Sequence, residues 1–131
     1  MTKDHIEKSN SERQASCQLE SIREMVKPLR GRDSDKREDA IQTIQEDALS
    51  VEVRSGWHPP GDNTNNGAEY NILLCTGGPA VRIIGDLSAH GEPETARLEH
   101  QDWGTPWTEY RMDSDEEKDV LAYAAQFYFG N

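Results

Sequence analysis

The sequence has 131 residues, enough for one domain with a single hydrophobic core. It carries 25 acidic and 14 basic side chains, a formal net charge of −11 at pH 7, and only 34% of its residues are hydrophobic. No apolar run approaches the roughly 18 residues that would span a membrane, and the stretch MTKDHIEKSNSER lacks the apolar core of a secretory signal. Cys17 and Cys75 are far apart, so no disulfide framework is expected. We therefore expect a cytoplasmic protein with no membrane partner.

The negative charge is concentrated in the second part of the chain. Residues 1–50 hold 11 acids and 9 bases, whereas residues 51–131 hold 14 acids and 5 bases, a net charge of −9. Direct binding of nucleic acid needs a basic surface over the phosphates, so this charge argues against it. It favours a basic protein partner attracted over long range, although acidity that only keeps the protein soluble would give the same composition.

The first part of the chain predicts two helices behind a short tail. Residues 1–10 are polar and are expected to be disordered. A first helix is predicted from about residue 11 to near Val26, because Pro28 disfavours helix at the residue before it. A second helix is predicted from Asp33 or Ser34 to about residue 48. Each has one narrow apolar stripe at helical spacing, with the members Leu19, Ile22, Met25, Val26 and Leu29 in the first and Ala40, Ile41, Ile44 and Ala48 in the second.

Residues 11–48 thus predict a helical hairpin. Its stripes are too narrow to stand alone, so they require the two helices to cover each other, a sheet, or a second copy of the chain. A homodimer through the N-terminal helices is one option that the sequence leaves open.

From Leu49 onward the pattern is that of strands. Apolar residues alternate with polar ones over 49–57, while EYNILLC and AVRIIGDL are apolar enough for central strands. Residues 95–103 and 106–112 predict further short strands. The segment HPPGDNTNNGA, residues 58–68, predicts a long loop, and TGGP, residues 76–79, predicts a turn. We expect an antiparallel meander of four or five strands.

A closing helix follows the strands. Ser114 and Glu117 have the spacing of a capping box, and the helical spacing continues through Val120, Leu121, Ala124, Phe127 and Tyr128. This helix is expected to pack on the sheet, so that residues 49–131 form a sheet with a C-terminal helix. The predicted fold class is α+β, with the whole chain forming one compact domain.

No catalytic or metal-binding signature is present, so we predict a protein that is not an enzyme and needs no cofactor. The turn after Cys75 lacks the lysine of a phosphate-binding loop, and the four histidines make no metal-binding pair. A site formed across the fold from His58, His90 and His100 stays open, as does a small-ligand or enzymatic pocket between the loop 58–68 and the turn 76–79. Close carboxylate pairs are expected by chance among so many acids.

The stretch DWGTPWTEY places Trp103, Trp107 and Tyr110 close together, separated by a turn. Such aromatics either complete a core, form a partner-binding surface or stack on a small ligand. The sequence leaves these alternatives open for Trp103 and Trp107, including one tryptophan inside and one at the rim.

The segments SGWHPPG, EYNILLCTGGPAVRIIGDL, ARLEHQDWGTPWTEY and AQFYFG resemble a mostly uncharacterised family of small acidic proteins carried by phages, prophages and other mobile elements of Gram-negative bacteria. The resemblance covers about residues 47–130 and excludes the N-terminal helices. The family brings no established catalytic residues. It implies a context in which small acidic proteins inhibit host defence systems, as anti-CRISPR proteins do, by binding basic surfaces that otherwise hold nucleic acid.

Charge and resemblance together predict a non-enzymatic inhibitor or regulator that presents carboxylates in place of DNA phosphates to a nucleic-acid-binding host defence complex. The candidate partner-binding residues are the acids and the tryptophan around the last strands and the closing helix, namely Glu92, Glu94, Glu99, Asp102, Trp107, Glu109, Asp113, Asp115 and Glu116.

Overall fold

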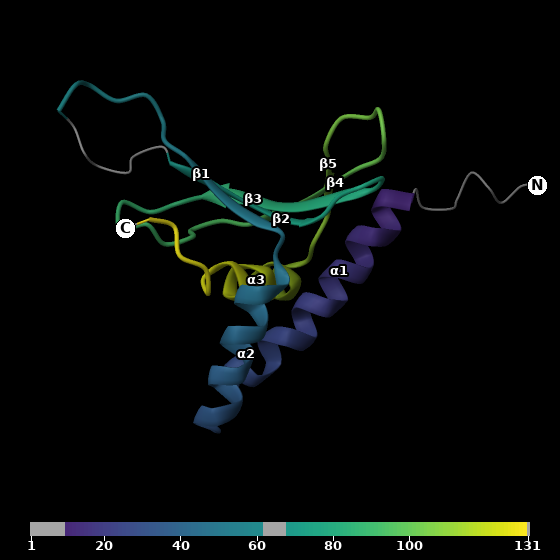
Figure 1. Ribbon diagram of the computed structural model, residues 1–131, viewed down its shortest axis with the longest axis vertical. Coiled ribbons are helices and arrows are strands. Elements are labelled where there is room, and N and C mark those ends of the chain that lie inside the picture. Colours follow the sequence, from purple (N-terminus) through teal and green to yellow (C-terminus); the bar gives the residue numbers. More distant parts are fainter. Residues whose placement is uncertain (1–9, 62–67, 131) are drawn as a thin grey trace, which may run out of the picture.

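The computed structural model describes residues 10–61 and 68–130 and has helices on one side of a five-stranded antiparallel sheet (Figure 1). This is the α+β class that the sequence predicted. The elements in chain order are α1 (Asn10–Val26), the 3-10 helix η2 (Lys27–Arg30), α2 (Ser34–Asp47), β1 (Ser50–Arg54), β2 (Glu69–Cys75), β3 (Ala80–Asp86), β4 (Arg97–Gln101), β5 (Thr108–Tyr110) and α3 (Ser114–Ala124).

The strands follow one another in space as they do in sequence, in the order β1-β2-β3-β4-β5. Every neighbouring pair is antiparallel, which gives the predicted meander with five strands. A bulge between Leu73 and Cys75 shifts the register at the end of β2. Because side chains alternate along a strand, the sheet has two distinct faces, and each strand contributes to both.

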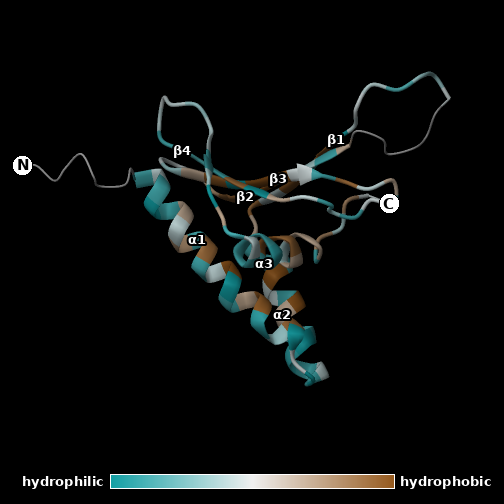
Figure 2. Ribbon diagram, turned by 180° about the vertical axis from the view of Figure 1, so that it is seen from behind, coloured by the Kyte–Doolittle hydropathy of each residue, from teal (hydrophilic) through white to brown (hydrophobic). Residues whose placement is uncertain are grey.

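The helix-side face of the sheet forms the core with α1 and α3. Tyr70, Ile72, Val81, Ile83 and Leu98 from the strands are all at most 1% exposed, and they pack against a buried group made of Leu19, Ile22, Val120 and Tyr123 from the two helices. In Figure 2 the apolar residues concentrate in the sheet and on the helix surfaces toward it, while the outer turns of α1 and α2 are mainly hydrophilic.

The two N-terminal helices differ in how they meet the rest of the molecule. Helix α1 contacts β3, β4 and α3, so it packs directly under the sheet, a point that the sequence left open. Helix α2 contacts chiefly η2 and α1, and it buries only Ala40 and Ile44. In Figure 1 it runs from the far end of the helical layer back toward β1. Self-association through these helices remains a prediction.

Two of the predicted helix boundaries are explained by local contacts. Asp33 caps α2 by accepting hydrogen bonds from the backbone N–H groups of Asp35 and Lys36, as its position before the helix suggested. The capping box of α3 lies one residue earlier than predicted. Asp113 and Glu116 form it, not Ser114 and Glu117, because an aspartate in the capping position accepts the backbone N–H of Glu116 while the Glu116 side chain accepts that of Asp113.

Some predicted features lie partly outside the described residues. Of the predicted disordered tail 1–10, residues 1–9 lie outside the described ranges, and Asn10 is the first residue of α1. The loop 58–68 is described only at residues 58–61 and 68. Within the described ranges, no helix is both long enough and apolar enough to cross a membrane.

Candidate functional site

The second face of the sheet is not covered by any helix in the described part of the chain (Figure 1). We call it the open face and define it by the residues that alternate with the buried ones, Glu52, Arg54, Glu69, Asn71, Leu73, Arg82, Ile84, Arg97, Glu99 and Glu109. An exposed sheet face that carries charged, amide and aliphatic groups together is available for contact with another molecule.

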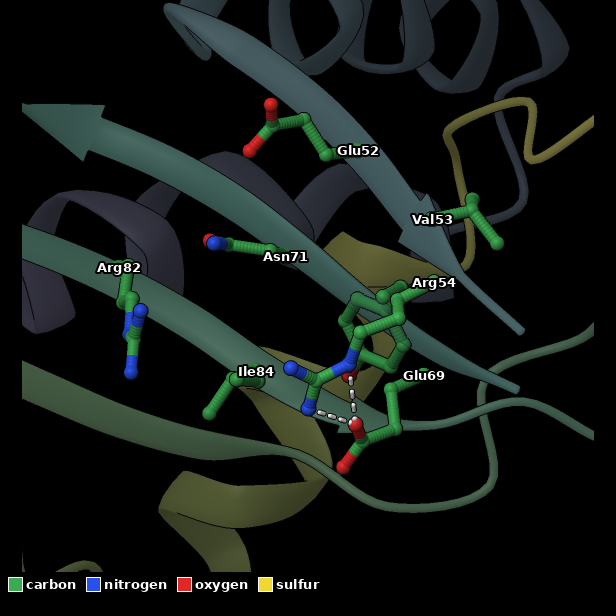
Figure 3. A pocket seen from close by; sticks show the side chains of 8 residues that line it. Glu52, Val53, Arg54, Glu69, Asn71, Arg82 and Ile84 are labelled. Carbon is green, nitrogen blue, oxygen red and sulfur yellow. Dashed lines mark hydrogen bonds and ion pairs between the residues drawn. The ribbon is translucent and has the colours of Figure 1, made fainter. Parts of the chain in front are cut away.

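Ion pairs organise much of the open face. The guanidinium of Arg82 donates to Glu99 Oε1 from Nε at 2.8 Å and from Nη2 at 2.7 Å, and Arg97 Nε lies 3.9 Å from Glu99 Oε2. Arg54 and Glu69 form a second pair (Figure 3), and the hydrogen bond from Arg54 lowers the pKa of the Glu69 carboxyl. These paired groups largely cancel one another's charge.

Trp107 lies over this network. The Arg82 Cζ atom is 4.1 Å from the centroid of the Trp107 ring, so a cation–π contact holds the indole on the open face, where it is half-buried. Trp107 is therefore neither part of the helix-side core nor a fully exposed side chain. It fixes the position of the arginine that binds Glu99.

Two other tryptophans are almost fully accessible. Trp103, in the turn between β4 and β5, is 91% exposed, and Trp57, in the loop after β1, is fully exposed. Figure 1 shows both loops rising on the side of the sheet opposite the helices, at its two ends. The open face thus lies between two loops that each present an indole.

Asp102 is turned inward to hold helix α1. Its Oδ1 accepts the backbone N–H of Ser11 at 2.9 Å, and its Oδ2 accepts the Ser11 hydroxyl at 2.9 Å. Because that hydroxyl has one proton, the 2.8 Å contact with His100 Nδ1 is one in which the imidazole donates. Ser11 is 1% exposed and its proton goes to the carboxylate, so this Ser-His-Asp group anchors a helix and is not a hydrolytic triad.

Asp119 joins the helical elements in a similar way. It is 5% exposed, and its two oxygens bind Arg23 Nε of α1 at 2.8 Å and Arg30 Nη1 of η2 at 2.6 Å. Burial alone would raise the pKa of Asp119, but the hydrogen bonds from both arginines outweigh it, and the pKa falls below its ordinary value. Arg23 also lies 3.8 Å from Glu116, which ties the start of α3 to α1.

The structure distributes the nine predicted partner-binding residues over four places. Glu92 and Glu94 are exposed in the β3–β4 connection, and Asp102 lies inward at the β4–β5 turn. Glu99, Trp107 and Glu109 are on the open face, whereas Asp113 caps α3 and Asp115 and Glu116 lie in its first turn. They do not converge on a single surface, and several have partners within the chain.

Two residues with the strongest claim to partner contact were missed by sequence reasoning or left undecided. The alternation over residues 49–57 predicts that Trp57 belongs to a strand, although the following sequence HPPG is typical of a loop that leaves the sheet. For Trp103 the sequence does not distinguish a core position from a surface position. Its exposure follows from the turn that begins at Asp102, where Thr105 N–H donates to the Asp102 carbonyl.

The metal, cysteine and pocket candidates of the sequence are not assembled in the described part of the chain. Among residues 10–61 and 68–130 no three His, Cys, Asp or Glu side chains converge as a metal site requires. Burial raises the pKa of the Cys75 thiol, which disfavours the reactive thiolate. The seven residues of β2 separate the described parts of the loop 58–68 from the turn 76–79, which lie at opposite ends of that strand. The turn lines a hollow with residues 101–105 instead.

A second hollow lies on the open face itself, over β1, β2 and β3. It has a volume of about 350 Å³ and lies between β1, β2 and β3, with Glu52, Arg54, Glu69, Asn71, Arg82 and Ile84 among its lining side chains (Figure 3). The Arg54–Glu69 pair and the aliphatic side chain of Ile84 form part of its wall, together with Glu52 and Asn71.

No protein-family model, no curated protein and no solved structure matches this chain.

Proposed function

We propose that this protein is a non-enzymatic acidic inhibitor or regulator from a phage or other mobile element, and that it binds a basic host protein that handles nucleic acid. The observation that carries the proposal is the uncovered sheet face between two loops whose tryptophans, Trp57 and Trp103, are almost fully exposed. Exposed tryptophans next to a polar surface are typical of the residues that dominate the energy of protein–protein interfaces.

The net charge of −11 supports a basic partner. Of the predicted acids, Glu92, Glu94, Glu109 and Asp115 are exposed and take part in no ion pair or helix cap among the described residues, whereas the exposed Asp113 caps α3. These four are the carboxylates that can replace DNA phosphates at a partner. The remaining predicted acids have partners within the chain, so they contribute to the field around the protein more than to direct contacts.

A capture experiment followed by binding measurements tests this proposal. The immobilised protein is exposed to a lysate of the host bacterium, and each captured protein is identified, purified and titrated with and without duplex DNA. We expect a basic, nucleic-acid-binding partner whose binding is competitive with DNA and weakens as salt increases. A partner that binds DNA and this protein at the same time, with no salt dependence, would reject the proposal.

The tryptophan loops are tested by the double substitution Trp57→Ala and Trp103→Ala. Removing two exposed indoles at an interface is expected to weaken partner binding on the order of 100-fold or more. The matched control is Tyr128→Ala, because Tyr128 is also a large exposed aromatic, at 76%, but lies in the C-terminal segment after α3. Equal effects of the two changes would exclude the open face as the contact surface.

A further inference from the structure

The hollow on the open face has two acceptor groups to which no described residue donates, the side-chain oxygen of Asn71 and the carboxylate of Glu52. The side-chain oxygen of Asn71 is buried and has no hydrogen-bond partner among the described residues. Glu52 lies directly opposite Asn71 in the β1–β2 register, and its carboxylate is exposed and takes part in none of the ion pairs of the described residues. A buried acceptor without a donor costs free energy, so this position is expected to gain from a ligand that brings N–H groups.

The positive groups that line the same hollow are already neutralised. Arg54 is bound by Glu69, and Arg82 is bound by Glu99 and stacked on Trp107. Glu52 is therefore the carboxylate whose charge is left without compensation in the hollow. Figure 3 shows Glu52 and Asn71 extending from neighbouring strands to the same side of the sheet, away from the paired Arg54 and Glu69.

We propose that this hollow receives a cationic side chain, in the first place an arginine, from the basic partner. The guanidinium has five N–H donors and no acceptor, so it can satisfy Asn71 Oδ1 and the Glu52 carboxylate together. Its aliphatic stem would lie along Ile84, which lines the same hollow. The inference rests on the proposed function for the identity of the partner, but the pocket can be tested without that partner.

The probe is an acetylated and amidated Gly-Arg-Gly peptide, compared with the same peptide carrying citrulline, which has the shape of arginine without its charge. The full chain labelled with ¹⁵N is titrated with each peptide and followed by NMR. We expect the arginine peptide to shift the signals of Glu52, Ile84 and the Asn71 side-chain amide, and the citrulline peptide to bind at least several-fold more weakly.

Two variants with one control make the assignment specific. Glu52→Gln should lower the affinity for the arginine peptide by about tenfold, because it removes a charge-assisted hydrogen bond. Asn71→Asp should raise that affinity, an effect that a merely structural role of Asn71 would not produce. Glu38→Gln, at an exposed position of α2, changes the net charge by the same amount as Glu52→Gln and should leave the affinity unchanged within twofold.

Two results would overturn the inference. One is a set of shifts spread over the acidic surface, with Glu38→Gln as effective as Glu52→Gln. The other is binding of inorganic phosphate at the hollow in place of the arginine peptide, which would assign an anion site to Arg54 and Arg82. Either failure would leave the proposed function intact if the partner still competes with DNA and depends on Trp57 and Trp103. Conversely, a functional pocket without such a partner would reject the proposed function alone.

Discussion

The two faces of the sheet are built from the same strands but differ in almost every physical respect. On the helix side, residues such as Ile83 and Leu98 are fully buried under α1 and α3. On the open face, the neighbouring residues Arg82 and Glu99 form an ion pair beneath Trp107. The first face is held together by the removal of apolar surface from water, and the second by paired charges at the surface, which contribute little to stability.

This difference separates stability from recognition within a single sheet. The free energy of folding is expected to come mainly from the helix side, so that side chains of the open face can be chosen for contact with a partner. Changes on the helix side should therefore unfold the protein, and changes on the open face should alter binding while the fold persists.

The largest expected effect contrasts two adjacent isoleucines of β3. Ile83 is 0% exposed in the core, and its replacement by alanine should destabilise the protein by about 3 kcal/mol, through lost burial and the cavity left behind. Ile84 points to the open face and is only partly buried, so Ile84→Ala should cost about 1 kcal/mol. Urea denaturation followed by circular dichroism measures both. Equal losses would break the distinction between the faces.

An intermediate effect is expected at Asp119, which joins the helices by ion pairs. Asp119→Asn should cost about 2 kcal/mol at neutral pH, because two charge-assisted hydrogen bonds to Arg23 and Arg30 are weakened. The folded-state pKa of Asp119 is depressed, so this contribution is complete above the ordinary value of 3.8 and is lost as the pH falls through the lower, folded-state pKa.

Denaturation curves at several pH values check the sign for Asp119. The difference in stability between the natural protein and Asp119→Asn should be constant near neutral pH and shrink in acid. Glu94→Gln removes an exposed carboxylate with no ion pair in the described structure and should show no such trend. A difference that grows as the pH falls would contradict the structure.

The smallest of these effects is expected at the start of α1. Ser11→Ala removes the hydroxyl that connects Asp102 and His100 and should cost about 1 kcal/mol. Ser21 is exposed on the same helix, and Ser21→Ala should stay within about 0.5 kcal/mol of the natural protein. The stabilities of the two variants are compared with that of the natural protein by thermal unfolding. A Ser11→Ala variant with unchanged stability would mean that the hydroxyl adds nothing to the backbone hydrogen bond between Ser11 and Asp102.

Local features of the fold were predictable because their cause is local. Leu19, Ile22 and Val26 recur at helical spacing and are all buried in α1, and the apolar segment EYNILLC forms the strand β2 as predicted, with Tyr70 and Ile72 buried. The edge strand β1 shows the limit of that signal. Its alternating valines look like a buried face, yet Val53 is 46% exposed, because no strand in the described structure pairs with its outer edge.

The candidate site was less predictable because its determinants are far apart in the sequence. Ser11 and Asp102 are separated by 91 positions, and Arg23 and Asp119 by 96. No local pattern distinguishes an aspartate that holds a distant helix from one that faces solvent. The same limit applies to Trp107, whose position depends on Arg82 in another strand. The composition gives the net negative charge. Only the fold shows which carboxylates bind other groups of the chain and which ones face solvent.

Asp102 and Trp103 are consecutive residues with opposite orientations. The first holds the backbone and hydroxyl of Ser11, and the second is exposed at the β4–β5 turn. A molecule that immobilises this turn by gripping the indole thereby also protects the first turn of α1 from opening, although it touches no atom of that helix. Slower hydrogen–deuterium exchange of the amides near Ser11 would therefore show that a partner has bound at Trp103, on the opposite side of the sheet.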